Sequence, residues 1–374
     1  MIKSFKKAAA ALLALVMAVS TTACSTDKSW VMKSDSLTVP IGAYIYFLYN
    51  SYQSASSMVT DTTKPLLQQQ VEGQNAEAWI KDQALTHTKM LYVLNDKMKE
   101  LKLTLTADET KNISSTTDSQ WEQSSSTLEK YGISKSSYNL AYADYFTKYQ
   151  KVFNAVYGKG GAKAVSDADL KAYFEKNYTD FAFMYQSLYN ADSNGTTKAL
   201  TTAEANDIKK KFDAYAADVS SGKKTLEKAA EDYKTSAKLT EVPYQATTQS
   251  LTSSSLPTEL ITLLKSMKDG EIKTAEISGT YIVVQKNDIT KKSAEQLGTE
   301  DGRSAVLSEM KAKEYSDEME KEAKAYTKAQ VNQAAVDSYK PAMFETATSS
   351  TAAATASTAA SAAADTASTA TSSK

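Results

Sequence analysis

Apolar residues in the first half of the chain recur at the three- and four-residue spacing of amphipathic helices. Residues 76–101 keep this spacing throughout, which predicts one long helix with a single buried face. Thr106 followed by Glu109 is the pattern of a capping box and predicts the start of another helix. A tyrosine-rich stripe follows at 134–158. Residues 36–160 are therefore expected to be all-helical.

The pattern changes from helical to alternating after Asp180. Phe181, Phe183 and Tyr185 should point to one side of a half-buried strand, and the residues between them to the other side. The next residues predict, in chain order, a helix between Thr201 and Gly222, a helix at 226–233, a polar stretch, a helix around 256–267 and a strand at 281–284. This order indicates a small α+β unit inserted between helical regions.

A long charged helix is expected near the end of the chain, from about Gly302 to Tyr339, where Pro341 would end it. Its apolar side needs a partner surface, and the amino-terminal helices offer one. The residues from Glu345 onward are almost entirely Ala, Ser and Thr. They lack the apolar bulk that offsets the entropy of ordering, so a disordered tail is expected at 342–374.

The amino terminus has the three-part pattern of a secretion signal. Lysines in residues 1–7 precede an apolar run at 8–19, and small residues lead to Cys24. The run is about 18 Å long as a helix, well short of the ~30 Å hydrocarbon core of a bilayer. Cys24 is the only cysteine and stands where a bacterial lipobox has its lipid-bearing cysteine. The alternative is ordinary cleavage after Ala23, which would leave a free thiol.

Charge and composition narrow the chemistry further. With 43 basic and 44 acidic residues the formal net charge is −1, and Arg303 is the only arginine, so a nucleic-acid partner is not expected. One cysteine and one histidine, His87, exclude disulfide frameworks, Cys/His zinc sites and a Cys/His nucleophile pair. No metal and no cofactor are expected. His87 lies on an apolar stripe, which favours a packing role.

Four segments follow one another between residues 165 and 285: VSDADLKAYFEKNYTDF, TLEKAAEDY, SLPTELITLLKSMKDGEI and GTYIVVQ. With this order, over about residues 36–340, the chain resembles extracytoplasmic foldases of the PrsA and SurA type. The resemblance implies a mainly α fold with an α+β insert. A helical chaperone domain would be built from the amino-terminal helices and the last long helix, with a parvulin-like small-sheet domain between them.

The resemblance also implies a division of the chain. The expected parts are a signal peptide at 1–23, a lipidated leash at 24–35, the amino-terminal part of the helical chaperone domain at 36–178, a parvulin-like domain at 179–290, a carboxy-terminal helix at 291–341 that completes the chaperone domain, and the tail at 342–374. Lipid on Cys24 would hold the protein on the outer face of the bacterial cytoplasmic membrane.

Prolyl cis/trans isomerisation is the reaction associated with parvulins. Its barrier is ~18–20 kcal/mol, so a catalyst needs an apolar cup for the proline ring and polar groups that weaken amide conjugation. The family's paired histidines fall on or beside Gln186 and on Tyr281, so both are replaced. Leu256 and Leu260 match apolar positions of the cup. The resemblance therefore implies a degenerate isomerase site whose activity is weak or lost.

Three functions remain open from the sequence. The first is a membrane-anchored chaperone or foldase that holds unfolded secreted polypeptides on an apolar, tyrosine-rich helical surface. The tyrosines at 44–52 and 138–149 fit either that surface or a core. The second is an active parvulin-type peptidyl-prolyl isomerase with Gln186 and Tyr281 in altered roles. The third is a solute-binding lipoprotein, which needs two α/β lobes around a cleft. A homodimer is left open.

Overall fold

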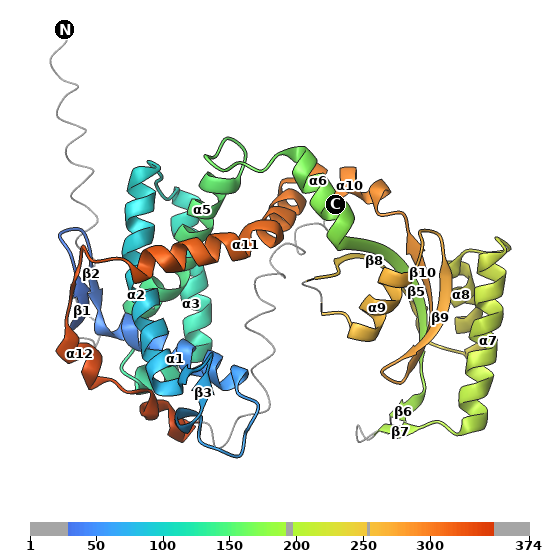
Figure 1. The fold of residues 1–374 in the computed structure, drawn as a ribbon. Helices are drawn as coiled ribbons and strands as arrows, with labels where there is room; N and C mark the ends of the chain where they lie inside the picture. Colours follow the sequence, from blue (N-terminus) through green and yellow to red (C-terminus); the bar gives the residue numbers. More distant parts are fainter. Residues whose placement is uncertain (1–28, 192–196, 253–254, 348–374) are drawn as a thin grey trace, which may run out of the picture. The chain divides into compact units, whose positions relative to one another are not determined.

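The computed structural model covers most of the chain (Figure 1). It describes residues 29–191, 197–252 and 255–347. The predicted signal peptide, Cys24 as the predicted lipid attachment residue, and residues 348–374 of the predicted tail lie outside the described residues.

The chain divides into two compact units. The first, here called the helical unit, combines residues 1–155 with residues 315–374, and the second, the sheet unit, comprises residues 156–314. The sheet unit is larger than the predicted parvulin-like range of 179–290. Residues on both sides of that range belong to it because the helix before the sheet contacts the helix after it.

The helical unit is built from amphipathic helices, as the spacing predicts. Its first helices are α1 (Ile41–Met58), α2 (Ala76–Glu100), α3 (Ala107–Lys130), α4 (Lys135–Asn139), the π-helical turn η2 (Leu140–Asp144) and α5 (Tyr145–Tyr157), which continues into the sheet unit; the short 3-10 turn η1 (Leu66–Gln68) precedes α2. Both halves of the predicted capping box are present at the start of α3, between Thr106 and Glu109. The fold class is confirmed: the protein is mainly α with small antiparallel sheets.

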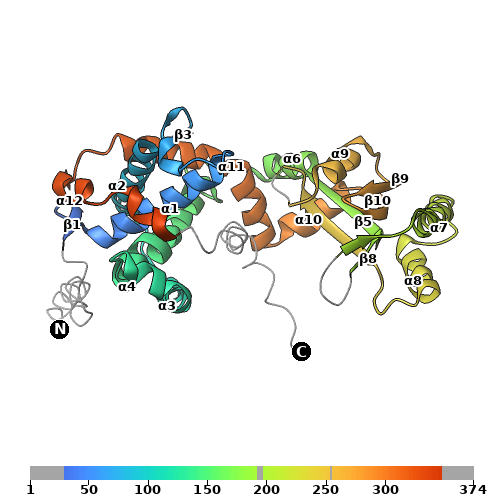
Figure 2. The same cartoon turned by 90° about the horizontal axis from the view of Figure 1, so that it is seen from below.

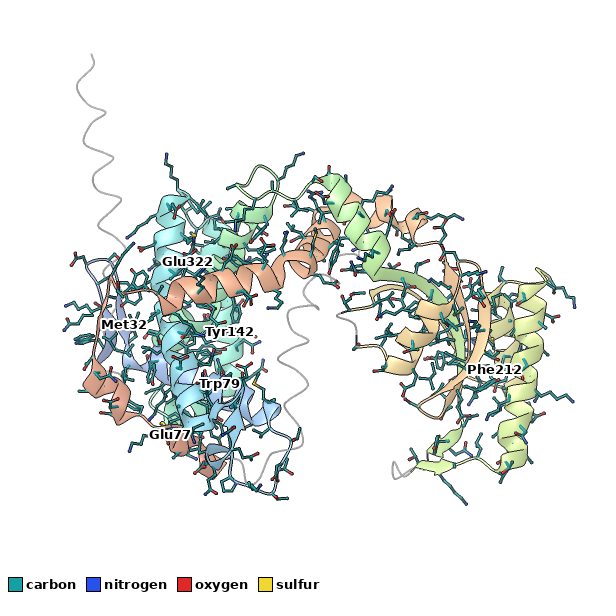
Figure 3. The ribbon with its side chains drawn as sticks, in the orientation of Figure 1. Met32, Glu77, Trp79, Tyr142, Phe212 and Glu322 are labelled. Atoms are coloured by element: carbon teal, nitrogen blue, oxygen red, sulfur yellow. The ribbon has the colours of Figure 1, made fainter. Side chains whose placement is uncertain are left out.

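Short strands interrupt the region that was expected to be a leash followed by helices only. β1 (Trp30–Lys33) pairs with β2 (Thr38–Pro40) and with β11 (Gln330–Val331), and β3 (Gln70–Val71) forms a hairpin with β4 (Gln74–Asn75). Met32 of β1, labelled in Figure 3, is completely buried. The prediction missed this sheet because two-to-four-residue strands carry little periodicity, and β11 lies almost 300 residues away from β1.

The last long helix is shorter than predicted. α11 (Glu300–Lys324) ends fifteen residues before Tyr339 and is followed by β11, α12 (Gln333–Ser338) and the 3-10 turn η3 (Pro341–Ala347). The residues after α11 leave the helix because they add a strand to β1. The carboxy-terminal half of α11 packs in the helical unit: the Tyr315 hydroxyl donates to the Tyr149 carbonyl at 3.1 Å, and Lys97 pairs with Glu322 at 2.6 Å.

The expected disordered tail does not begin at residue 342. Phe344, in η3, is 1% exposed and makes ring contacts with Tyr49, Tyr52 and Tyr131 at centroid distances of 5.4, 5.6 and 4.9 Å. Two large apolar residues, Met343 and Phe344, directly before a long Ala, Ser and Thr stretch were too weak a pattern to predict this. The burial of Phe344 among these rings attaches η3 to the helical unit.

The sheet unit has one four-stranded antiparallel sheet in the order β8-β5-β10-β9. Its elements are α6 (Asp167–Asn177), β5 (Tyr178–Ser187), β6 (Tyr189–Ala191), β7 (Thr197–Ala199), α7 (Thr202–Ser220), α8 (Leu226–Ala237), β8 (Tyr244–Ser250), α9 (Thr258–Ser266), β9 (Ile272–Ile277), β10 (Thr280–Asn287), α10 (Thr290–Gly298) and the first half of α11. β8 replaces part of the stretch that was expected to be merely polar.

The two faces of this sheet carry separate cores. Ala182, Met184 and Val283 point toward α7 and α8, and Phe181 and Val284 point toward α9. Figure 1 and Figure 2 show α7 and α8 on one side of the sheet and α9 on the other. The alternation predicted along β5 is therefore observed. Because successive residues of a strand point to opposite faces, this alternation determines which candidate residues can lie in the same site.

Candidate functional site

Gln186 and Tyr281 lie directly opposite each other on neighbouring strands, β5 and β10. Their side chains are on the face that α7 and α8 cover. The Tyr233 hydroxyl of α8 donates to Gln186 Oε1 at 3.1 Å, and the Tyr281 hydroxyl donates to Asp213 Oδ1 of α7 at 2.9 Å. Burial, and to a lesser degree the Asp213 carboxylate, raise the pKa of the Tyr281 hydroxyl. Each polar end already has a partner within the fold.

Leu256 and Leu260 lie on the opposite face of the sheet from this pair. Leu260, on α9, is 6% exposed and belongs to the core formed with Phe181 and Leu264, and Leu256 packs against the same core half-buried. The structure thus brings the two polar candidates together but separates them from the two apolar ones. The reason is the strand geometry, because successive side chains of a strand point to opposite faces.

Two aromatic residues that were not named as candidates lie on the α9 face. Phe183 and Tyr185 are half-buried, their ring centroids are 5.7 Å apart, and both pack against the core that contains Leu256 and Leu260. The alternation along β5 had already placed these rings on one side of the strand. The alternation could not predict on which side of the sheet α9 would pack, because that depends on the tertiary structure.

The helical unit presents a row of aromatic rings that reaches the surface. The row consists of Trp121 on α3, Tyr138 on α4, Tyr142 in η2 and Phe146 on α5. Neighbouring centroids are 5.7, 5.1 and 5.5 Å apart along the row. Tyr138 is 5% exposed, whereas Phe146 is 56% exposed, the largest exposure of any large apolar side chain among the described residues. Figure 3 labels Tyr142 at the middle of the row.

The row packs against a buried ring of α1. Tyr46 of α1 contacts Tyr138 edge-on at 5.2 Å, and burial raises the pKa of Tyr46 to about 12. The π-helical turn adds one residue to the helical repeat at 140–144, a distortion that is common at functional sites. Tyr138 and Tyr142 stack at an interplanar angle of 18°. The exposed end of the row is thus attached to a rigid support.

His87 has the packing role that its place on the apolar stripe predicted. Its ring stacks on Phe47 at 5.6 Å, and the Tyr145 hydroxyl lies 3.4 Å from its Nδ1. Burial lowers the pKa of His87, and the Glu320 carboxylate opposes this to a smaller degree. A neutral, stacked imidazole with one neighbouring hydroxyl is not arranged for proton transfer to a ligand.

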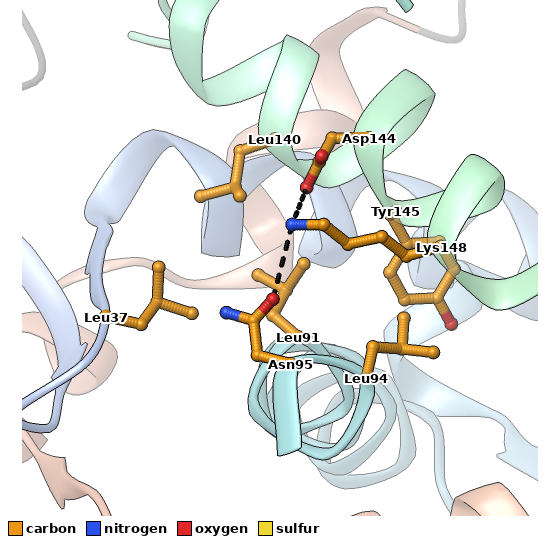
Figure 4. A pocket seen from close by; sticks show the side chains of 8 residues that line it. All are labelled: Leu37, Leu91, Leu94, Asn95, Leu140, Asp144, Tyr145 and Lys148. Atoms are coloured by element: carbon orange, nitrogen blue, oxygen red, sulfur yellow. Dashed lines mark hydrogen bonds and ion pairs between the residues drawn. The ribbon is translucent and has the colours of Figure 1, made fainter. Parts of the chain in front are cut away.

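A notch between α2 and η2 is filled by its own polar groups. Figure 4 shows the Lys148 ammonium between the Asp144 carboxylate, at 2.7 Å, and the Asn95 amide oxygen, at 3.2 Å. Leucines surround these groups, and the notch has no room for a water molecule. The ion pair stabilises the packing of α2 against η2 and offers no place for a ligand.

The described part of the chain has neither a cluster of metal ligands nor a membrane-spanning helix. Among residues 29–191, 197–252 and 255–347 there is no group of three His, Cys, Asp or Glu side chains that could hold a metal ion. Over the same part of the chain, the helices are each too short or too polar to span a lipid bilayer.

Comparison with known proteins gives no match at the level of sequence and several at the level of structure. No family model matches the sequence, and no curated protein sequence matches it. The matching solved structures include PrsA foldases and peptidylprolyl isomerases, the family that the sequence resembles.

The foldase PrsA from Lactococcus lactis is 15% identical, and the match covers 82% of this chain and 96% of that chain at a TM-score of 0.35. PrsA from Streptococcus pneumoniae is 16% identical, with 71% and 89% of the two chains covered at a TM-score of 0.36. The peptidylprolyl isomerase PrsA from Bacillus cereus is 11% identical, with 75% and 95% covered at a TM-score of 0.28.

Proposed function

We propose that this protein is an extracytoplasmic chaperone of the foldase type, which binds unfolded or partly folded secreted polypeptides. The observation that carries the proposal is the aromatic row Trp121–Tyr138–Tyr142–Phe146, in which Tyr138 is buried, Trp121 and Tyr142 are partly buried, and Phe146 is largely exposed. Aromatic side chains provide large apolar contact areas with little loss of conformational entropy, and tyrosine adds a polar group. Such a surface accepts varied sequences because it does not require a fixed hydrogen-bond pattern.

The proposed site favours weak and broad binding. Within the row only Phe146 is mostly exposed; Tyr142, which contacts it, and Trp121, at the other end of the row, are half-buried. A client would therefore gain a few apolar contacts, each of the order of 1–3 kcal/mol before the cost of association is subtracted. A foldase needs this weakness, because it must release its clients.

We place the protein on the outer face of the cytoplasmic membrane, held by lipid on Cys24. The support is the secretion pattern of residues 1–23 and the position of the only cysteine directly after it. Incorporation of labelled fatty acid in a bacterial host should be lost in Cys24→Ala, which would otherwise still be exported.

The isomerase alternative has less support from the geometry. Gln186 and Tyr281 already hydrogen-bond Tyr233 and Asp213, and Leu256 lies on the other face of the sheet. A proline ring in an apolar cup on the α9 face would be out of reach of both polar groups. We therefore propose that isomerase activity is weak or lost.

The solute-binding alternative is not favoured either. Its two lobes would need parallel strands around a cleft, whereas every strand pair among the described residues is antiparallel.

The proposal is tested by the aggregation of an unfolded client. The mature chain, beginning at Cys24, should slow the light scattering of urea-denatured citrate synthase after dilution, at an equimolar dose. Phe146→Ser should remove much of this protection, because it deletes the most exposed ring of the row. Met58→Ser is the matched control, since Met58 is 52% exposed at the end of α1. Absence of protection by the unmodified chain, or equal effects of the two variants, would contradict the proposal.

A further inference from the structure

β8 is one of the two edge strands of the sheet unit's four-stranded sheet, and its outer side is not paired within that sheet. β8 pairs with β5 over seven consecutive positions, from Tyr178 opposite Ser250 to Met184 opposite Tyr244, with no bulge. Among the described residues no strand pairs with its other side, since the order is β8-β5-β10-β9. Figure 2 shows β8 along this edge.

The register decides which main-chain groups of β8 face outward. Leu251 N–H donates to the Asn177 carbonyl and Tyr185 N–H donates to the Pro243 carbonyl, at 2.7 and 3.1 Å. Both pairs belong to the register of β8 with β5, so the pairs at every second position between them also exchange hydrogen bonds. Gln245, Thr247 and Gln249 therefore direct their N–H and C=O groups toward β5.

The residues between these direct their main-chain groups away from the sheet. Ala246 and Thr248 each present one outward N–H and one outward C=O, and the side chain of Ala246 is exposed. Successive outward residues are about 6.6–6.8 Å apart along a strand, the spacing that an added strand requires.

The opposite edge of the same sheet carries the usual protection against added strands. β9 has two charged residues, Lys273 and Glu276, and Glu276 pairs with Lys209 of α7 at 2.7 Å. β8 reads YQATTQS, without charge, proline or glycine. Natural proteins protect edge strands with charges, prolines and bulges, so a seven-residue edge that lacks all three is unusual.

Side-chain contacts hold β8 in its extended form. The Thr248 hydroxyl donates to Asp180 Oδ1 at 2.7 Å, and Asp180 Oδ2 accepts from the Asn287 amide at 2.9 Å. Ser250 at one end donates to Glu309 of α11 at 2.5 Å, and Tyr244 at the other end packs against the α8 core. The edge is thus pre-organised, which lowers the entropic cost of adding a strand.

We propose that the outer edge of β8 binds an extended, uncharged segment of a client polypeptide as a fifth strand of the sheet. This inference rests on the proposed function, which supplies non-native polypeptides as the partner. The chemistry of the edge indicates this kind of partner. Main-chain groups recognise another extended main chain whatever its side chains are. The sequence YQATTQS has no charge, so it offers no ion pair to a charged segment. The protein would then contact clients through two modes, aromatic and main-chain.

The first test uses a labelled peptide of alternating threonine and valine with the mature chain. Binding should weaken by about tenfold when alternate residues of the peptide are N-methylated, because each lost hydrogen bond costs a few-fold in affinity. Hydrogen exchange at the Ala246 and Thr248 amides should slow when the unmethylated peptide binds. The Gln245 and Thr247 amides, already bonded to β5, should not change. Equal binding of both peptides would overturn the inference.

The second test removes one outward donor without touching the ladder to β5. Ala246→Pro deletes an N–H that faces away from the sheet, which is where an edge strand tolerates proline. Ala246→Ser is the matched control, because it keeps the N–H. We expect about tenfold weaker peptide binding for Ala246→Pro and none of this loss for Ala246→Ser. Ala246→Lys, which places a charge on the edge, should act like Ala246→Pro and serves if the proline variant misfolds.

The outcomes separate this inference from the proposed function. If Ala246→Pro and Ala246→Lys bind the peptide as well as the unmodified chain, while Phe146→Ser loses protection of citrate synthase, the β8 inference fails and the chaperone proposal stands. If the peptide binds as described but no protection occurs, the chaperone proposal fails. A dimer that dissociates on Ala246→Pro, without peptide binding, would assign the edge to a second copy of this chain and overturn the inference.

Discussion

The helical unit and the sheet unit use their aromatic residues in different ways. In the helical unit rings contact rings in a continuous network, and one end of that network reaches the surface at Phe146. In the sheet unit the rings are divided between the two faces of one sheet, and the tyrosines Tyr233 and Tyr281 use their hydroxyls within the fold.

This difference shows where apolar binding surface is available. Rings four residues apart on a helix contact one another because they lie on the same stripe, so the largely exposed Phe146 is in contact with the partly buried Tyr142. A sheet covered by helices on both faces buries its side chains, so its remaining outward feature is the main chain of an edge strand. The two modes of client binding proposed here follow from these two geometries.

The largest expected effect tests whether the helical unit and the sheet unit have separate hydrophobic cores. Phe344→Ala should lower the free energy of unfolding of the helical unit by about 3–5 kcal/mol, because Phe344 is buried among three tyrosine rings. Hydrogen exchange should then become faster at α2 amides and stay unchanged at β10 amides. Phe212→Ala, in the sheet unit, should give the reverse pattern (Figure 3). Faster exchange in both units from either variant would contradict separate cores.

An intermediate effect concerns pH and is confined to the helical unit. Because burial lowers the pKa of His87 in the folded state, the unfolded state binds the proton more readily. Stability is therefore highest above the unfolded pKa near 6.5 and falls as the pH drops below it, by at most about 1.4 kcal/mol per pH unit.

Urea midpoints measured between pH 7 and pH 5 would show this slope. His87→Gln should flatten it, since His87 is the only histidine of the chain. An equally steep slope in the variant would assign the pH dependence to carboxylates instead.

The smallest expected effect tests the proposal that isomerase activity of the sheet unit is weak or lost. Tyr281→Phe removes the hydrogen bond to Asp213 and should cost about 1 kcal/mol or less, because both groups are partly exposed. In a protease-free assay with a proline peptide, the unmodified chain and the variant should both match the buffer rate. A rate above buffer that falls in Tyr281→Phe would restore the isomerase alternative.

The sequence predicted the elements that have a long local pattern. The four-and-three spacing at 76–101 gave α2, the capping box gave the start of α3, and the alternation after Asp180 gave both faces of β5. The resemblance to the foldase family, rather than local spacing, pointed to Gln186 and Tyr281, which are cross-strand partners. For the three local patterns the information lies within a few residues, where spacing decides which side chains share a face.

Tertiary structure decided what depends on distant residues. β11 pairs with β1 across the length of the chain, and Phe344 finds its tyrosine pocket among residues almost 300 positions earlier. The same holds for the separation of Leu256 and Leu260 from Gln186, which follows from the face on which α9 packs. Local spacing determines which residues share a face, but only the packed chain determines what that face meets, because burial is a property of the whole fold.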